Sequence, residues 1–157
     1  MSSPLQRVKQ TLTIATNGIY QIQEVPELTC PTDGVHPIDV MFNAPGMGYV
    51  PLAKYFEHQL GEHLKVWART ALMAVVTYIS MKPGKKVLVG GHAVLQPALM
   101  WAIAEAMMAY GEGFKTENAC DIQKMALEVN LQECEALRLN IACHEAGVTR
   151  CEHITLD

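Results

Sequence analysis

The chain has 157 residues, of which 50% are hydrophobic and 18% are charged, with a formal net charge of −4. This length and apolar share indicate one globular domain, residues 1–157, and exclude a disordered tail. The negative charge argues against a binder of duplex nucleic acid or of an anionic membrane, while a local pocket for a small anion stays open. No apolar run approaches the roughly 20 residues of a membrane span, and residues 1–10 lack a signal-peptide core, so we expect a soluble, cytoplasmic protein.

The cysteines predict reduced thiols, because their number is odd and no secretory signal accompanies them. They are Cys30, Cys120, Cys134, Cys143 and Cys151. Together with His144 and His153, the last three supply the residue types that bind zinc, but a paired C-x2-C knuckle is missing. Burial as small hydrophobic residues explains them more simply, so we expect no metal site and keep a cysteine or zinc enzyme as an alternative.

The N-terminal part predicts a β-hairpin after a loose lead-in, residues 1–10. Two β-prone runs flank Asn17-Gly18, a dipeptide typical of tight hairpin turns, which predicts strands over residues 11–15 and 19–25. Residues 26–37 contain three prolines and predict a surface connection within the domain.

A strand, a glycine loop and a helix then follow one another twice. Residues 38–42 predict a short strand, Asn43–Gly48 a glycine loop, and Pro51 the start of a helix. A second, amphipathic helix ends at Lys82-Pro83-Gly84, and its apolar face is Leu64, Trp67, Ala68, Ala71, Leu72, Val75, Val76 and Ile79. The order recurs with a strand over 86–89, the turn Gly90-Gly91-His92, and a helix over 98–110 that Pro97 opens.

The helix over 98–110 is apolar almost all round, with Glu105 as its only charge. Such a helix is either central in the fold or pressed against another subunit, and we expect a homodimer. Beyond it, a helix over 117–145 that stops at Gly147 and a closing strand over 148–156 complete the chain.

Strands that alternate with helices predict an α/β fold: a Rossmann-like mixed, mostly parallel sheet flanked by helices, with an N-terminal β-hairpin. In such sheets ligands bind beyond the carboxyl ends of the strands, where the two glycine loops would lie side by side. The candidate ligand-binding residues are Asn43, Gly46, Gly48, Gly90, Gly91 and Gln96, with Thr16 and Asn17 at the same edge. Glycines after strands also merely form turns, and Thr16 and Asn17 are typical turn formers.

His92 is the one titratable residue within a glycine loop. Because its charge can change near neutral pH, it is the candidate catalytic acid or base. The alternative is a histidine that caps the following helix.

The segments KVLVGGHAVLQPALMWAIAEA and IDVMFNAPGMGYVPLAKYFEHQLG resemble CRISPR-associated Rossmann-like domains, including the small stand-alone ring nucleases. The resemblance covers residues 38–110 and implies a cyclic oligoadenylate ligand, bound across the two-fold axis of a dimer. It implies that the ligand site is lined by Asn43, Gly46, Met47, Gly48, Gly90, Gly91, His92 and Gln96. It further implies cleavage by the ribose 2′-OH, with neither metal nor cofactor.

The leading hypothesis is therefore a dimeric protein that binds a cyclic oligoadenylate second messenger and degrades it. Two alternatives stay open beside the zinc or cysteine enzyme. One is a non-catalytic α/β module that senses a nucleotide or small anion. The other is a structural or assembly subunit whose helices 64–79 and 98–110 are interaction faces.

Overall fold

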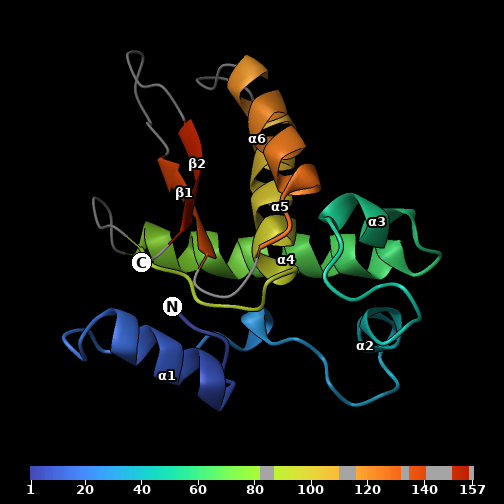
Figure 1. Ribbon diagram of the computed structural model, residues 1–157. Coiled ribbons are helices and arrows are strands. Elements are labelled where there is room, and N and C mark those ends of the chain that lie inside the picture. The colour runs from blue at the N-terminus through green and yellow to red at the C-terminus, as the bar shows by residue number, and fades with distance from the viewer. Residues whose placement is uncertain (82–86, 110–115, 132–134, 141–149, 156–157) are drawn as a thin grey trace.

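The computed structural model describes residues 1–81, 87–109, 116–131, 135–140 and 150–155, and within them the fold is mainly helical (Figure 1). Among these residues, six helices and one short 3-10 turn, η1, precede a pair of strands. The elements are α1 (Gln6–Ala15), η1 (Pro26–Leu28), α2 (Pro37–Phe42), α3 (Leu52–Glu57), α4 (Gly61–Ser80), α5 (Leu95–Ala109), α6 (Thr116–Glu128), β1 (Glu135–Asn140) and β2 (Arg150–Thr155).

The expected Rossmann-like α/β fold is wrong. The two strands of the described residues are antiparallel neighbours, with Glu135 opposite Thr155 and Asn140 opposite Arg150. The predicted strand over 38–42 is helix α2, because Pro37 presets the first helical turn and the ring Nδ1 of His36 accepts a hydrogen bond from the Ile38 N–H at 3.2 Å. A five-residue apolar run suits a buried helical turn as well as a strand.

The predicted N-terminal hairpin is also wrong, because residues 6–15 form helix α1. Asn17 and Gly18 end this helix with φ angles of 49° and 66°, and the Gly18 N–H donates to the Thr13 carbonyl at 2.8 Å. The left-handed conformation that makes Asn-Gly a good hairpin turn also makes it a good helix C-terminus.

The first residues pair with two distant segments. Ser2 forms isolated parallel bridges with Glu24 and Gly90, and both Ser2 and Ser3 are fully buried. The loose lead-in expected over residues 1–10 is therefore part of the packed structure. The strand expected over 86–89 is an extended connection that takes part in this pairing; Lys86 lies outside the described residues.

Three predicted helices are confirmed: the one that starts at Pro51 as α3, the amphipathic one as α4 and the apolar one as α5. The helix predicted over 117–145 is right only as far as Glu128, because residues 135–140 form β1. Leu137 and Leu139 alternate with Arg138 and Asn140, a period of two that suits a strand. The closing strand is confirmed as β2, whereas Gly147 lies outside the described residues.

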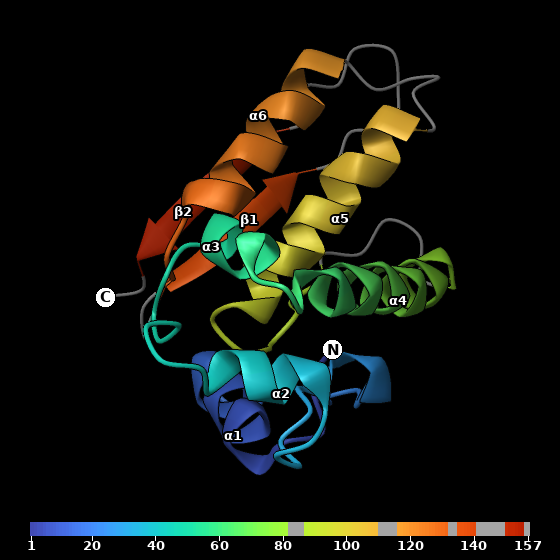
Figure 2. The same ribbon diagram turned by 90° about the vertical axis from the view of Figure 1, so that its right-hand side faces the viewer.

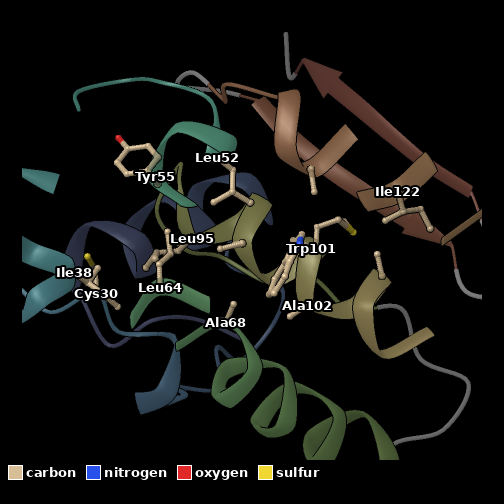
Figure 3. Packing of buried hydrophobic residues seen from close by; sticks show 14 of the residues in the cluster. Cys30, Ile38, Leu52, Tyr55, Leu64, Ala68, Leu95, Trp101, Ala102 and Ile122 are labelled. Atoms are coloured by element: carbon tan, nitrogen blue, oxygen red, sulfur yellow. The ribbon is translucent and has the colours of Figure 1, made fainter. Parts of the chain in front are cut away.

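Helix α5 lies at the centre of the hydrophobic core, with nine of its fifteen residues buried. Figure 3 shows Leu95, Trp101 and Ala102 of α5 among side chains of the surrounding helices. Those helices contribute fully or nearly fully buried residues: Ile38 and Met41 from α2, Leu52 and Tyr55 from α3, Leu64 and Ala68 from α4, and Ala119, Ile122 and Ala126 from α6. The apolar sequence of α5 thus reflects a central position within one chain.

Glu105, the one charge of α5, pairs with α4. Its carboxylate accepts two hydrogen bonds from the Arg69 guanidinium, at 2.7 Å from Nε and 2.6 Å from Nη2. The same guanidinium stands 5.3 Å from the ring centre of Trp101. The bidentate hydrogen bonds to Glu105 and the cation–π contact with Trp101 fix the rotation of α4 relative to α5.

Candidate functional site

The first glycine loop is held by its own helices. The Asn43 amide donates to the Asp39 carbonyl at 2.8 Å and to the Asp39 carboxylate at 3.0 Å, which closes the C-terminus of α2. The Tyr55 hydroxyl of α3 donates to the Met47 carbonyl. Gly46, with φ of 80°, makes the turn between the two helices, and Gly48 follows it. These contacts account for the loop without a ligand.

The second glycine loop packs against α1. A Cβ at Gly90 would lie 2.7 Å from the Leu12 Cδ1, so the close approach of α1 requires glycine there. A Cβ at Gly91 would meet the Gln96 Cγ at an ordinary 3.7 Å. The apolar space beside Gly90, Gly91 and Gln96 measures about 10 Å³, which is at most room for one water molecule and far too small for a nucleotide.

His92 lies at the start of α5, where its carbonyl accepts hydrogen bonds from the Leu95 and Gln96 N–H groups. The Arg7 Nη2 stands 3.1 Å from its ring Nδ1, so Nδ1 accepts and the ring proton belongs on Nε2. Nε2 is buried and has no hydrogen-bond partner among the described residues. Burial and the Arg7 charge lower the pKa of His92, which keeps the ring neutral at pH 7.

Neither ring nitrogen of His92 is therefore presented to an open cavity. Nδ1 is engaged by Arg7, and solvent does not reach Nε2. Proton transfer to a bound substrate needs a group within hydrogen-bond reach of that substrate. The catalytic role of His92 stays a prediction, and the contacts seen here are those of a histidine at a helix start. The pairing with Arg7 was missed because the two residues are 85 positions apart in the chain.

Thr16 and Asn17 lie at the C-terminal end of α1, one turn beyond Leu12, the residue that packs against Gly90. The Thr16 hydroxyl donates to the Leu12 carbonyl at 2.7 Å, and Asn17 is part of the helix cap. Both act as helix-ending residues, which corresponds to the turn-forming alternative.

The described residues give no support to the hypothesis of a cysteine or zinc enzyme. Cys30 is buried, and burial together with the charge of Asp39 raises its pKa to about 11, so the thiol stays protonated at neutral pH. Within the part of the chain that the structure describes, no group of three metal-ligating side chains occurs. Cys134, Cys143 and His144 lie outside the described residues; Cys151 and His153 are placed in β2 by backbone register alone.

An open hollow of about 380 Å³ lies along α6. Its lining is Asp121, Lys124, Met125, Glu128 and Val129, all from this helix and the residue after it. A hollow bounded by one helix lacks the convergent polar groups from several elements that mark a binding pocket.

A further candidate surface is the outer side of α4. The name α4 face is used here for Val66, Thr70, Met73, Thr77 and Ser80, which recur every three or four residues and are all exposed. Val66 is 59% exposed and Met73 is 65% exposed. No charged residue occurs between Thr70 and Met81. In Figure 2 the C-terminal half of α4 projects toward the right-hand edge of the molecule.

The hydroxyl groups of the α4 face are turned inward to the helix backbone. Thr70 donates to the Val66 carbonyl at 3.0 Å, Thr77 to the Met73 carbonyl at 2.8 Å, and Ser80 to the Val76 carbonyl at 2.8 Å. With these bonds made, a neighbouring protein can cover the face without leaving a hydroxyl unsatisfied. The sequence analysis described only the opposite, apolar side of this helix and did not single out the α4 face; its signal is the 4-3-4 spacing from Val66 to Thr77.

Comparison with protein-family models, curated proteins and solved structures finds no match to the chain. In the described part of the chain, no helix is long and apolar enough to cross a membrane. The function is therefore inferred from the contacts, burial and charges of the described residues.

Proposed function

We propose that the protein is a structural subunit that acts by binding another protein through the α4 face. The observation that carries this proposal is an uncharged helix surface with large exposed apolar side chains and internally satisfied hydroxyls. This proposal develops the assembly-subunit alternative and moves the interaction surface from the buried side of α4 to its exposed side.

Covering the α4 face supplies a favourable free energy of binding. Full burial of a valine or methionine side chain contributes about 1.5–3 kcal/mol, and Val66 and Met73 both keep more than half of their surface exposed. Val76 and Met81, exposed by 45% and 73%, extend the apolar surface beside the α4 face. Large contiguous apolar patches on the surface of a soluble protein are typical of interaction sites.

Binding and cleavage of cyclic oligoadenylate stays an untested prediction. It depended on a parallel sheet that places the two glycine loops side by side, and that sheet is wrong. The loops are instead closed by Asn43 and Tyr55 in one case and by α1 in the other. The geometry thus supports the α4 face more strongly than either loop.

A photo-cross-linking amino acid tests the proposal in cells that express the protein. With p-benzoylphenylalanine in place of Met73, we expect a cross-linked protein of higher mass after irradiation. The matched control carries the same group at Gln10, an exposed residue of a different helix, α1, and should give no such product. A Met73 derivative that cross-links no more than the Gln10 derivative would contradict the proposed function.

A further inference from the structure

The pair Asn17-Gly18 has a chemical reactivity that is separate from its role at the end of α1. An asparagine side chain loses its amide when the backbone nitrogen of the next residue attacks the side-chain carbonyl carbon. Glycine hinders this attack least, because it has no Cβ. Of the five asparagines in the sequence, only Asn17 precedes glycine; the others precede alanine, leucine or isoleucine.

The Asn17 side chain is open to solvent. Asn17 is exposed, and so are its large neighbours Ile14, Ile19 and Tyr20, with exposed fractions of 76%, 74% and 70%. Among the described residues, no hydrogen bond holds the Asn17 amide. Water can therefore reach the carbon that reacts, and the ammonia that is released can leave.

The attacking nitrogen, in contrast, is engaged in the folded chain. The Gly18 N–H donates to the Thr13 carbonyl at 2.8 Å, and this bond closes the C-terminus of α1. The nitrogen must give up that proton before it attacks, so the reaction requires the last turn of α1 to open. Helix ends are where such opening costs least.

We infer that Asn17 is a site of spontaneous deamidation, which becomes reactive when the last turn of α1 opens. The Gly18 nitrogen loses its proton and forms a bond to the side-chain carbonyl carbon of Asn17. The bond from that carbon to the amide nitrogen breaks, and ammonia leaves with the proton. Water then opens the resulting cyclic imide at either carbonyl, which gives aspartate or isoaspartate at position 17.

The two products weaken the end of α1 by different amounts. Aspartate adds a carboxylate at the helix C-terminus, where the backbone dipoles already place negative charge. Isoaspartate adds a methylene group to the main chain as well, which displaces Gly18 from the Thr13 carbonyl. Leu12, which packs against Gly90, lies in the preceding turn. Deamidation therefore loosens α1 from the second glycine loop as the protein ages.

Incubation of the full chain in mildly alkaline buffer, followed by trypsin digestion and mass spectrometry, tests the reaction. Cleavage after Lys9 and Lys54 places Asn17 and Asn43 in one peptide, residues 10–54. Asn43 is the internal control, because it is also exposed but precedes alanine, and its amide donates to Asp39. We expect conversion of Asn17 and not of Asn43. An Asn17 that stays intact as long as Asn43 in the folded chain overturns the inference.

The same assay in urea tests whether opening of α1 controls the reaction. Asn17 should react about fivefold more slowly in the folded chain than in urea, the factor that one hydrogen bond of about 1 kcal/mol gives. Leu12→Ala, which loosens α1, should speed the reaction in the folded chain and leave the rate in urea unchanged. Equal rates for Asn17 in the folded chain and in urea overturn the role of the α1 end.

Hydrogen exchange measures the consequence for α1. Aged protein should exchange the amides of α1 faster than fresh protein. The matched variant Asn17→Asp carries the new charge without the added methylene, so its α1 should exchange more slowly than that of the aged protein. Identical exchange in aged and fresh protein, after conversion of Asn17 has been shown, would overturn the loosening of α1.

Discussion

Helices α4 and α5 are both rich in apolar residues, yet the fold uses them differently. α5 is surrounded by its own chain, so its apolar residues stabilise the folded state. α4 buries Leu64, Ala68 and Ala71 on one side and exposes Val66 and Met73 on the other. The difference shows that apolar content alone does not locate an interface: the informative feature is a second apolar side that the described chain leaves uncovered.

The largest expected effect on the free energy of unfolding distinguishes the buried side of α4 from its exposed side. Leu64→Ala removes a fully buried side chain and should lower the free energy of unfolding by about 2–5 kcal/mol. Val66→Ala, two residues along the same helix, should change it by less than about 0.5 kcal/mol when the chain is monomeric. Urea denaturation at low protein concentration measures both. Equal losses for the two variants would show that the outer side is buried within the monomer.

The next effect tests the packing of α1 against the second glycine loop. In Gly90→Ala the new methyl group would lie 2.7 Å from Leu12, a buried side chain, so we expect a loss of about 1–3 kcal/mol in unfolding free energy. Gly91→Ala is the matched control, since its contact distance is ordinary. The double variant Gly90→Ala with Leu12→Ala should lose less unfolding free energy than the sum of the two single losses, because the clash is gone once Leu12 is shortened. If both glycine variants were equally mild, α1 would not pack as described.

A smaller effect comes from the link between α4 and α5. Glu105→Gln should cost about 1 kcal/mol, because the pair with Arg69 is bidentate but partly exposed. Hydrogen bonding to Arg69 lowers the pKa of Glu105, so this stabilisation is present above the unfolded-state value near 4.5 and is lost as the pH falls through the lower folded-state value.

Denaturation curves of wild type and Glu105→Gln should therefore converge at low pH. The control is Glu57→Gln, which removes an exposed ion pair with Lys54 and should change little at any pH. A difference between wild type and Glu105→Gln that persisted below the carboxylate titration would mean that packing, and not charge, links the two helices.

The smallest effect concerns His92. Because burial and Arg7 lower its pKa, the folded state resists protonation, and stability should decline as the pH falls below about 6.5. In ¹H–¹³C NMR spectra the His92 ring should titrate below that value. Replacing Arg7 with methionine removes the neighbouring charge and should raise the midpoint. A His92 midpoint at or above 6.5 in the wild type would contradict the buried, Arg7-bound geometry.

The sequence predicted the parts of the fold that local periodicity determines. Helix α4 follows from its spacing of apolar residues, α5 follows from a proline that opens an apolar run, and the closing strand β2 follows from alternation. It failed where a local signal suits two structures: Asn17-Gly18 ends a helix as readily as it turns a hairpin, and residues 38–42 form a helical turn after Pro37. The strands predicted over 38–42 and 86–89 led to the Rossmann-like fold, and the predicted hairpin made its sheet mixed.

Long-range contacts were beyond sequence reasoning for a different reason. The Ser2 bridges to Glu24 and Gly90, and the contact of Arg7 with His92, join segments that carry no mutual signal in a single sequence. The α4 face was within reach, because its spacing and its lack of charge are readable from residues 66–81. Recognising it required treating threonine as a residue that can bond its own helix and present a methyl group.

Photo-cross-linking in cells, with p-benzoylphenylalanine at Met73 beside the same group at Gln10, tests the α4 face as a binding surface most directly. The account predicts a cross-linked product of higher mass from the Met73 derivative, whose position is exposed, and no such product from the Gln10 derivative. A Met73 derivative that cross-links no more than the Gln10 derivative would contradict it.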